Sequence, residues 1–254
     1  MKLYHQRIGT GRPLVIVHGL FGSSDNWRAL AKQLAHYAEV ITVDLRNHGR
    51  SPHSLEQNYR LMTDDLAELL DDLNLDRVDM IGHSLGGKVA MSFSQHYPQR
   101  LHKLMVVDVS PRGYQDEHSP IFKALLALDL SQFSRRNEVD EALSQSIPDK
   151  VVRQFLLMNL AVNGDQLGWR INLQALSDSY PQLLQPVCQD VEIAVTACFI
   201  RGGRSTYVRD DDIALINTTF PYSEIVTIEQ AGHWVHAEAP VIFLDKVKQF
   251  FNYD

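Results

Sequence analysis

Short apolar segments alternate along the chain with segments whose apolar residues recur at helical spacing. The segments PLVIV, EVITVD, RVDMIG and KLMVVD are short and rich in β-branched residues, which is typical of buried strands. Between two of them, one segment carries acidic residues on one face and leucines on the other, namely Leu61, Leu66, Leu69 and Leu73. Strands that alternate with amphipathic helices predict an α/β fold, with a mainly parallel sheet covered on both faces.

The same alternation is present at both ends of the chain. KLYHQRI and PLVIV are separated by Gly-Thr-Gly, a turn sequence that predicts a β-hairpin. Near the C-terminus, VTACFIRGG, DDDIALINTTF, SEIVTIEQ and APVIFLDKVKQFF continue the order strand, helix, strand, helix. We therefore expect both ends to belong to one sheet.

The alternation stops between about residues 111 and 190. Helices are expected there around 119–129, 135–146, 149–162 and 172–180, and no segment resembles a strand. An insertion at the ligand-binding edge of an α/β sheet is typical of a lid or cap. We predict an α/β core from residues 1–110 and 191–254 and an inserted helical cap from residues 111–190. An independent helical domain is the alternative, although no Gly/Ser/Pro-rich linker flanks the segment.

Composition narrows the class of protein. The 254 residues are 44% hydrophobic and 22% charged, as in ordinary globular proteins, and the net charge is −7. An acidic chain is not expected to bind nucleic acid or an anionic membrane, which favour basic surfaces. The N-terminal residues lack the features of a secretory signal. Cys188 and Cys198 form neither a disulfide framework nor a zinc spacing, so we expect free thiols and a cytoplasmic location.

Three glycines surround one serine in the segment GHSLGG. Ser84 lies between a predicted strand and a predicted helix that begins near Leu85. At a sharp turn, Gly82 and Gly86 would remove Cβ atoms that clash, and Gly87 would let the helix pack closely on the strands. This pattern is the G-x-S-x-G nucleophile elbow, which presents the serine hydroxyl at the tip of the turn. A tight turn with an unreactive serine is the alternative.

A serine hydroxyl needs a base within hydrogen-bond reach. His233 follows the last predicted strand and precedes the last predicted helix, which places it at the edge where Ser84 emerges. We therefore predict His233 as the base. His236 is expected to face the loop exterior or to cap the helix. His83 should point away from its neighbour, and His18 should make a structural hydrogen bond. The other histidines considered are expected at the surface or in packing: His5, His36, His53, His96, His102 and His118.

A carboxylate should orient the imidazole and stabilise its cation. Beyond the penultimate strand, the position nearest the strand end holds Ser205. The aspartates Asp210, Asp211 and Asp212 come later, where acids commonly cap a helix. Asp108 ends the strand after the serine's helix, and burying it among apolar residues requires a partner such as an imidazolium. We favour Asp108, with the 210–212 cluster as the alternative and Ser205 as a supporting hydrogen-bond donor.

The oxyanion that develops during acyl transfer needs two preorganised N–H donors. The backbone of Leu85, directly after the serine and at a helix N-terminus, is one candidate. The segment HGLFG supplies the other, with Leu20 favoured and Phe21 as the alternative.

These motifs together resemble the α/β-hydrolase family. HGLFGSSDNW, DLRNHGRS, GHSLGG and AGHWVHAE match family signatures in order and spacing, and Ser84, Asp108 and His233 follow the family's chain order. The resemblance implies an eight-stranded core, a helical cap, no metal or organic cofactor, and hydrolysis of esters, including acyl-CoA thioesters. Two positions depart from the family pattern. Asn47 stands where glycine is usual, and Ser205 stands at the usual acid position.

We predict a serine carboxylesterase or thioesterase that acts on short- to medium-chain acyl esters through an acyl-enzyme. Its partner is a small-molecule ester or thioester, and the chain is expected to be a monomer or a homodimer. Phe21, beside the predicted oxyanion hole, and Trp234, beside the base, are candidates for substrate contact. Arg112 is a candidate for binding an anionic group.

Other functions are compatible with the same residues. Dehalogenases and epoxide hydrolases of this fold would carry Asp at position 84 and are not expected. A carbon–carbon hydrolase or a lyase would need a clamp for a carboxylate substrate, and the candidates are Arg46, Arg112, Arg201 and Arg204. A ligand receptor with residual hydrolysis is a third possibility from a different class.

Overall fold

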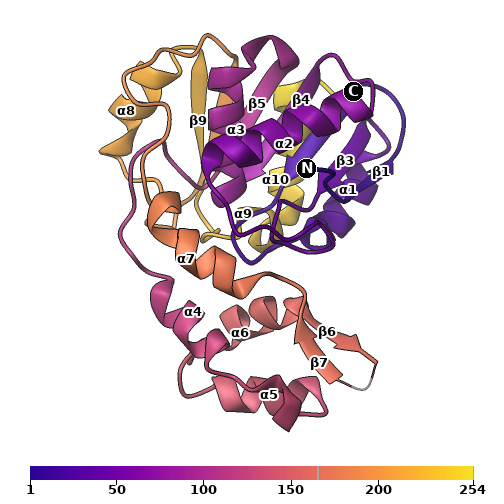
Figure 1. Cartoon of the computed structure of the whole chain (residues 1–254). Helices are drawn as coiled ribbons and strands as arrows, with labels where there is room; N and C mark the ends of the chain where they lie inside the picture. Colours follow the sequence, from indigo (N-terminus) through magenta and orange to yellow (C-terminus); the bar gives the residue numbers. More distant parts are fainter. Residues whose placement is uncertain (165, 254) are drawn as a thin grey trace.

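A seven-stranded sheet forms the centre of the computed structural model, which describes residues 1–164 and 166–253 (Figure 1). The strand order is β1-β3-β2-β4-β5-β8-β9, and β1 alone runs antiparallel to its neighbour. The predicted α/β fold with a mostly parallel sheet is confirmed, with seven described strands rather than eight. The strands are β1 (His5–Ile8), β2 (Pro13–Val17), β3 (Glu39–Val43), β4 (Val78–His83), β5 (Leu101–Val107), β8 (Ala197–Gly202) and β9 (Ser223–Ile228).

The predicted N-terminal hairpin is wrong. β1 pairs with β3, with Ile8 opposite Val40, so β3 lies between β1 and β2. The Gly-Thr-Gly turn takes the chain over the start of β3, and Gly9 and Gly11 have φ values of +81° and +115°. The prediction that Gly9 and Gly11 form a turn is therefore confirmed, whereas the predicted partner of β1 is wrong.

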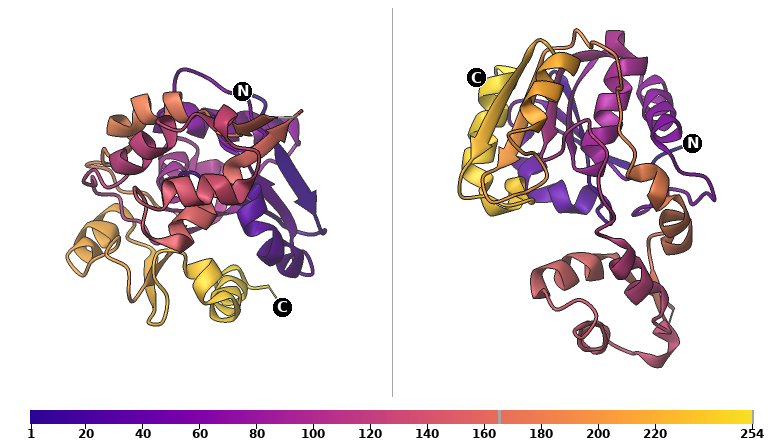
Figure 2. Two further views of the ribbon diagram at one scale, coloured as in Figure 1. Left: turned by 90° about the horizontal axis from the view of Figure 1, so that it is seen from below. Right: turned by 90° about the vertical axis from the view of Figure 1, so that its left-hand side faces the viewer.

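Strand pleating divides the apolar residues between two layers. On β2, Val15 and Val17 pack into one cluster with α2 (Tyr59–Asp72) and α3 (Leu85–His96). Leu14 and Ile16 point the other way, toward α1 (Arg28–Leu34) and α10 (Pro240–Phe251), because successive side chains on a strand alternate faces. The right-hand view of Figure 2 shows α2 and α3 on the opposite side of the strands from α10. The remaining core elements are α8 (Asp212–Thr219), α9 (Val235–Glu238) and the 3₁₀ turns Ser24–Trp27 and Pro98–Arg100.

The segment from α4 to α7, residues 119–183, which we call the cap, lies below the sheet in Figure 1. Three of its helices fall within predicted ranges but are shorter, namely α4 (Ser119–Leu126), α5 (Arg136–Leu143) and α6 (Lys150–Leu156). The fourth, α7 (Leu173–Leu183), begins within the range 172–180 and extends three residues beyond it. The 3₁₀ turns of the cap are Leu130–Gln132 and Leu157–Asn159.

The expectation that the cap contains no strand is also wrong. β6 (Leu160–Asn163) pairs antiparallel with β7 (Gln166–Trp169). Gly164, in the connection, has φ +63°, a conformation that glycine adopts readily. The predicted helix over 149–162 therefore ends early, because the apolar residues after Leu157 join a hairpin.

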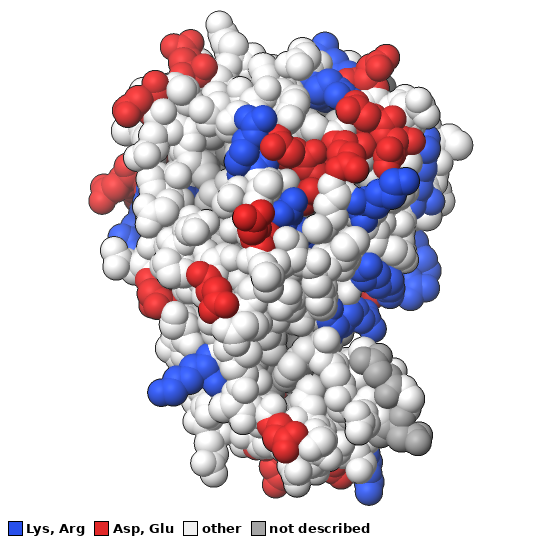
Figure 3. Space-filling model, in the orientation of Figure 1, with Lys and Arg blue, Asp and Glu red and all other residues white. Residues whose placement is uncertain are grey.

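Acidic and basic side chains lie next to one another on the face of the molecule shown in Figure 3. The acidic group at the upper right lies near α2, and basic side chains border it. Among the helices that the structure describes, none has both the length and the apolar character needed to cross a bilayer.

Candidate active site

Ser84 lies on a strained turn between β4 and α3. Its backbone has φ +52° and ψ −117°, a region that residues with a Cβ atom seldom occupy. The Ser84 N–H donates to the carbonyl of Val107 at 3.0 Å, which ties the turn to the end of β5. This is the local geometry that the G-x-S-x-G pattern requires, with the serine at the carboxyl edge of a parallel sheet.

The three flanking glycines are needed for space. A Cβ atom on Gly82 would lie 2.3 Å from the carbonyl oxygen of Gly86, directly across the turn. A Cβ on Gly86 would lie 2.4 Å from the Val17 carbonyl of β2, and one on Gly87 would lie 2.5 Å from Val109 Cγ1. Real Cβ contacts are essentially never that short, so the turn and the helix need glycine at positions 82 and 86, where the nearest atoms are backbone, and at position 87 the Val109 side chain would have to move.

Asp108 and His233 form an ion-pair geometry beside the turn. Asp108 directly follows β5, is fully buried, and has φ +50°. Its Oδ2 lies 2.7 Å from His233 Nδ1 and accepts a hydrogen bond from Ser205 Oγ, while its Oδ1 accepts from the Gly202 N–H at 3.0 Å. Both carboxylate oxygens of Asp108 thus have hydrogen-bond partners. Because Nδ1 of His233 faces Asp108, Nε2 is the ring nitrogen that remains available.

The alternative carboxylates make other contacts. Asp210 is 86% exposed and pairs with Arg201 at 2.6 Å. Asp212 accepts from the Arg209 N–H at the start of α8 and pairs with Arg112 at 2.9 Å. Asp211 is exposed. The structure therefore brings Asp108, rather than this cluster, into contact with the His233 ring.

His83 contacts His233 directly. Its Nε2 donates to the backbone carbonyl of His233 at 2.9 Å, and the two ring centres are 4.7 Å apart. Burial lowers the pKa of His83 well below its usual value, and the neighbouring His233 and His236 act in the same direction. A neutral His83 therefore positions the loop that carries His233, a role that its place beside Ser84 in the sequence did not suggest.

His236 is buried, contrary to the expectation of an exposed position. Its ring stacks on Trp27 with centres 4.0 Å apart and planes 13° apart, and burial lowers its pKa to about 3. His18, as expected, is structural. Its Nε2 accepts from the Leu45 N–H at 3.0 Å, so its Nδ1 donates to the Gly19 carbonyl at 2.7 Å. This bond orients the HGLFG loop.

A small cavity of about 60 Å³ adjoins Ser84. Leu20 and Leu85, the predicted backbone donors, both line it. Leu85 is the first residue of α3, and the first N–H groups of a helix have no intrahelical acceptor. Most other lining residues come from the cap or its connections. The remaining lining residues are Tyr59, Lys88, Val109, Tyr114, Gln115, Glu117, His118, Tyr180, Leu183, Leu184 and Tyr207.

Comparison with known proteins shows which family the chain belongs to. A family profile described as the alpha/beta hydrolase fold matches residues 12–146, more than half of the chain. The chain belongs to the α/β-hydrolase family. It is 38% identical to esterase YbfF of Escherichia coli over 249 residues, which cover 94% of this chain and 93% of that protein.

Two further relatives of this α/β-hydrolase cover most of its length. An sn-1-specific diacylglycerol lipase, ABHD11 of Mus musculus, is 38% identical over 93% of this chain and 80% of that protein. A solved structure titled marine microorganism esterase is 38% identical, with a TM-score of 0.96, and covers 98% of this chain and 99% of that one. The resemblance inferred from the motifs is thus confirmed.

The two departures from the family pattern have structural explanations. Asn47 has φ +64°, a conformation that asparagine tolerates better than most residues with a side chain. Its Nδ2 donates to Gln57 Oε1 at 2.8 Å, and its carbonyl accepts from the Asn172 N–H at the start of α7. Ser205, at the usual acid position, is hydrogen-bonded to Asp108.

The three predicted substrate contacts are not among the residues that line the cavity. Phe21 is buried against Phe122, with ring centres 4.8 Å apart. Trp234 packs on Phe155 at 5.5 Å. Arg112 pairs with Asp212 and also donates to backbone carbonyls, so its guanidinium is committed within the protein.

The cavity is instead lined by residues that the sequence did not predict as substrate contacts. His118 receives or donates a hydrogen bond at 2.8 Å with the Tyr180 hydroxyl, and burial lowers its pKa to about 4. Tyr207, which also lines the cavity, stacks on the His233 ring with centres 3.9 Å apart. Lys88 also lines the cavity. The sequence could have indicated it, because it lies one helical turn after Ser84 within GHSLGGK.

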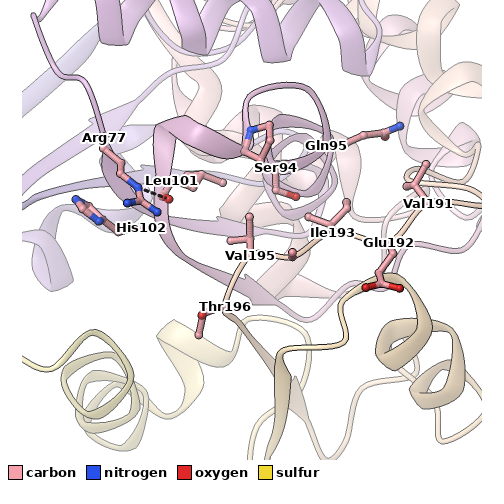
Figure 4. Close-up of a pocket in the computed structure, with 12 residues that line it drawn as sticks. Arg77, Ser94, Gln95, Leu101, His102, Val191, Glu192, Ile193, Val195 and Thr196 are labelled. Atoms are coloured by element: carbon pink, nitrogen blue, oxygen red, sulfur yellow. Dashed lines mark hydrogen bonds between the residues drawn. The ribbon is translucent and has the colours of Figure 1, made fainter.

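A roomier hollow of about 560 Å³ lies elsewhere. Figure 4 shows that Arg77, Leu101, His102 and Thr196 are among the residues around it. It adjoins the start of β5 and the approach to β8, whereas ligands of open α/β sheets bind beyond the carboxyl ends of the strands. Within the described ranges, no group of three or more His, Cys, Asp or Glu side chains is arranged to hold a metal ion.

Proposed function

We propose that this α/β-hydrolase is a serine carboxylesterase that acts on short- to medium-chain acyl esters through an acyl-enzyme. The observation that carries the proposal is the strained turn at Ser84 beside His233, whose ring contacts the buried Asp108. A strained backbone and a fully buried carboxylate both cost free energy. The strain is at Ser84, whose hydroxyl the turn presents, and the buried carboxylate is Asp108, which orients the His233 imidazole at the same edge of the sheet. The names of the relatives, two esterases and a diacylglycerol lipase, support ester substrates.

In the proposed mechanism, Ser84 Oγ attacks the ester carbonyl while His233 Nε2 takes its proton. Asp108 holds the Nδ1–H of the ring and stabilises the imidazolium. The backbone N–H groups of Leu20 and Leu85 stabilise the oxyanion. His233 then protonates the leaving alcohol, and a water molecule that it activates releases the acid.

This mechanism needs the His233 ring to reach the Ser84 hydroxyl in the substrate complex. The two residues share neighbours. The position of a Cβ on Gly19 lies 3.2 Å from Ser84 Cβ and 3.1 Å from His83 Nδ1, and His83 in turn holds the His233 backbone. Tyr207 contacts both the cavity beside Ser84 and the His233 ring.

The small cavity favours a short acyl or alcohol group, with longer groups requiring movement of the cap. Acyl-CoA thioesters are a second substrate class that the same chemistry permits. Rates measured for matched series of nitrophenyl esters and CoA thioesters of increasing acyl length distinguish the two classes.

Carbon–carbon hydrolysis or a lyase reaction on a carboxylate substrate is the less favoured alternative. Three of the four arginines that would form a clamp already have carboxylate partners: Arg46 with Asp65, Arg112 with Asp212, and Arg201 with Asp210. Committed guanidinium groups are poor ligands for an additional anion, which supports a neutral ester. A ligand receptor with residual hydrolysis would give a burst of product and negligible steady-state turnover.

The Ser84→Ala variant tests the proposal with p-nitrophenyl acetate and butyrate. We expect turnover to fall to the level of background hydrolysis, because the variant has no nucleophile. Ser94→Ala is the matched control, since Ser94 lies on the same helix, is buried, and donates only to the Met91 carbonyl. A near wild-type rate in Ser84→Ala would overturn the proposed function.

A further inference from the structure

Lys88 is a buried lysine one turn along α3 from Ser84. Its backbone N–H donates to the Ser84 carbonyl at 3.0 Å, and the residue is 2% exposed. Lysine is rarely buried to this degree without a paired charge. Among the described residues, the hydrogen-bond acceptors of its ammonium group are all backbone carbonyl oxygens.

These carbonyls belong to the two connections between the core and the cap. Nζ donates to the carbonyls of Arg112 and, at 3.5 Å, Pro111, where the chain enters the cap. It also donates at 3.0 Å to the carbonyl of Gln185, where the chain returns. We call residues 110–114 and 184–188 the hinge segments.

The hinge segments are also bonded to each other. The Tyr114 N–H donates to the Leu184 carbonyl at 2.8 Å, and the Val187 N–H donates to the Pro111 carbonyl at 2.9 Å. The Lys88 ammonium lies 5.0 Å from the centre of the Tyr114 ring. One cation therefore contacts both hinge segments at the point where they pair.

The hinge segments form part of the substrate cavity. Tyr114 and Leu184 line it together with Ser84 and Lys88 itself. A displacement of the hinge segments would move this wall relative to the serine.

We propose that Lys88 is a positioning residue whose ammonium group holds both hinge segments of the cap on the helix that carries Ser84, and thereby fixes the cap-side wall of the substrate cavity. The catalytic consequence rests on the proposed function, but the structural role does not. Burial lowers the pKa of Lys88 to about 7, and Arg112 acts in the same direction. The neutral amine retains two N–H donors and would hold the segments less tightly.

The Lys88→Met variant of the full chain tests this role by amide hydrogen exchange. We expect exchange at Tyr114 and Val187 to accelerate about tenfold, because their hydrogen bonds join the hinge segments. Lys103→Met is the matched control. Lys103 Nζ also donates to a backbone carbonyl, that of Phe250, but it joins β5 to α10 and makes no hydrogen bond to the hinge segments, all of which the structure describes. Unchanged exchange in Lys88→Met would overturn the proposal.

Kinetics provide a second, independent measurement. With p-nitrophenyl butyrate we expect KM of Lys88→Met to rise about fivefold with little change in kcat, since the wall moves but the reacting groups do not. A fall in kcat at unchanged KM would contradict the positioning role. If Lys88→Met does not fold, Lys88→Gln takes its place. Since glutamine keeps two donors, we expect the same changes at smaller size. Wild-type behaviour of Lys88→Gln in both measurements would then overturn the proposal. If Ser84→Ala shows that the chain is not an esterase, the exchange measurement still decides.

Discussion

Three residues with unusual backbone conformations lie around the proposed site. Ser84, Asp108 and Phe21 have φ values of +52°, +50° and +61°, although each carries a Cβ atom. Such conformations cost about 1–3 kcal/mol each and persist where surrounding structure enforces them. Ser84 and Asp108 follow the adjacent strands β4 and β5. Similar backbone conformations at the two strand ends place Asp108 against the His233 ring and Ser84 beside the cavity.

Asp108→Asn tests the assignment of the acid. The uncharged amide neither stabilises an imidazolium nor reliably selects the tautomer with the proton on Nδ1. We expect kcat to fall by about 10⁴-fold, by analogy with other triads. The measurement is steady-state hydrolysis of p-nitrophenyl butyrate. Asp210→Asn is the control, because that side chain is exposed and paired with Arg201. The assignment fails if Asp108→Asn is active and Asp210→Asn is not.

Individual site residues were predictable where strand order determined their place. Ser84, Asp108 and His233 each follow a strand of a parallel sheet, so they reach the same edge whatever the intervening chain does. His236, His118 and the contacts of Lys88 were not predictable. Their surroundings come from segments more than 60 residues distant, such as Trp27, Tyr180 and Gln185.

At the scale of elements, α3 is held unusually close to the sheet. The position that a Cβ on Gly86 would occupy is 2.4 Å from the Val17 carbonyl and 2.5 Å from the His18 carbonyl, both backbone atoms. At Gly87, by contrast, the nearest atom belongs to the side chain of Val109, which can rotate. The helix position therefore depends more on Gly86 than on Gly87.

The variants Gly86→Ala and Gly87→Ala separate these two effects. Alanine is otherwise favoured over glycine in a helix by about 1 kcal/mol. We expect Gly86→Ala to lose about 3 kcal/mol of unfolding free energy, within the range for overpacked sites, and to lose most esterase activity. Gly87→Ala should lose clearly less. Urea unfolding monitored by circular dichroism measures both, and equal losses would show that close packing at Gly86 is not what fixes α3.

Elements were predicted well where a local pattern suffices and poorly where partners matter. The turn residues Gly9 and Gly11 were recognised, but a turn sequence does not reveal that β3, about thirty residues later, enters between β1 and β2. In the cap, residues 160–162 are apolar and continue a helical pattern from Leu156. They become β6 because β7 is available to pair with them, a contact that periodicity alone does not show.

Considered as a whole, the molecule buries several histidines that are held neutral. Burial lowers the pKa of His48 and His236 to about 3 and that of His118 to about 4. It also lowers the pKa of His18 and His83. In the unfolded chain these groups protonate near pH 6.5. Below that pH the unfolded state binds more protons than the folded state, so the free energy of unfolding decreases as the pH falls.

His236→Phe isolates one of these contributions. Phenylalanine keeps an aromatic ring against Trp27 and removes Nδ1, which has no hydrogen-bond partner among the described residues. Between pH 6.5 and the folded-state pKa of about 3, the neutral state of His236 lowers the free energy of unfolding by about 1.4 kcal/mol for each pH unit of acidification. We therefore expect the variant to lose less stability than the wild type between pH 6.5 and 5, by about 2 kcal/mol in urea unfolding. The exposed His36→Phe is the control for removing one histidine. Parallel pH dependences of His236→Phe and the wild type would mean that His236 is protonated in the folded protein, and that its stacking on Trp27 tolerates the charge.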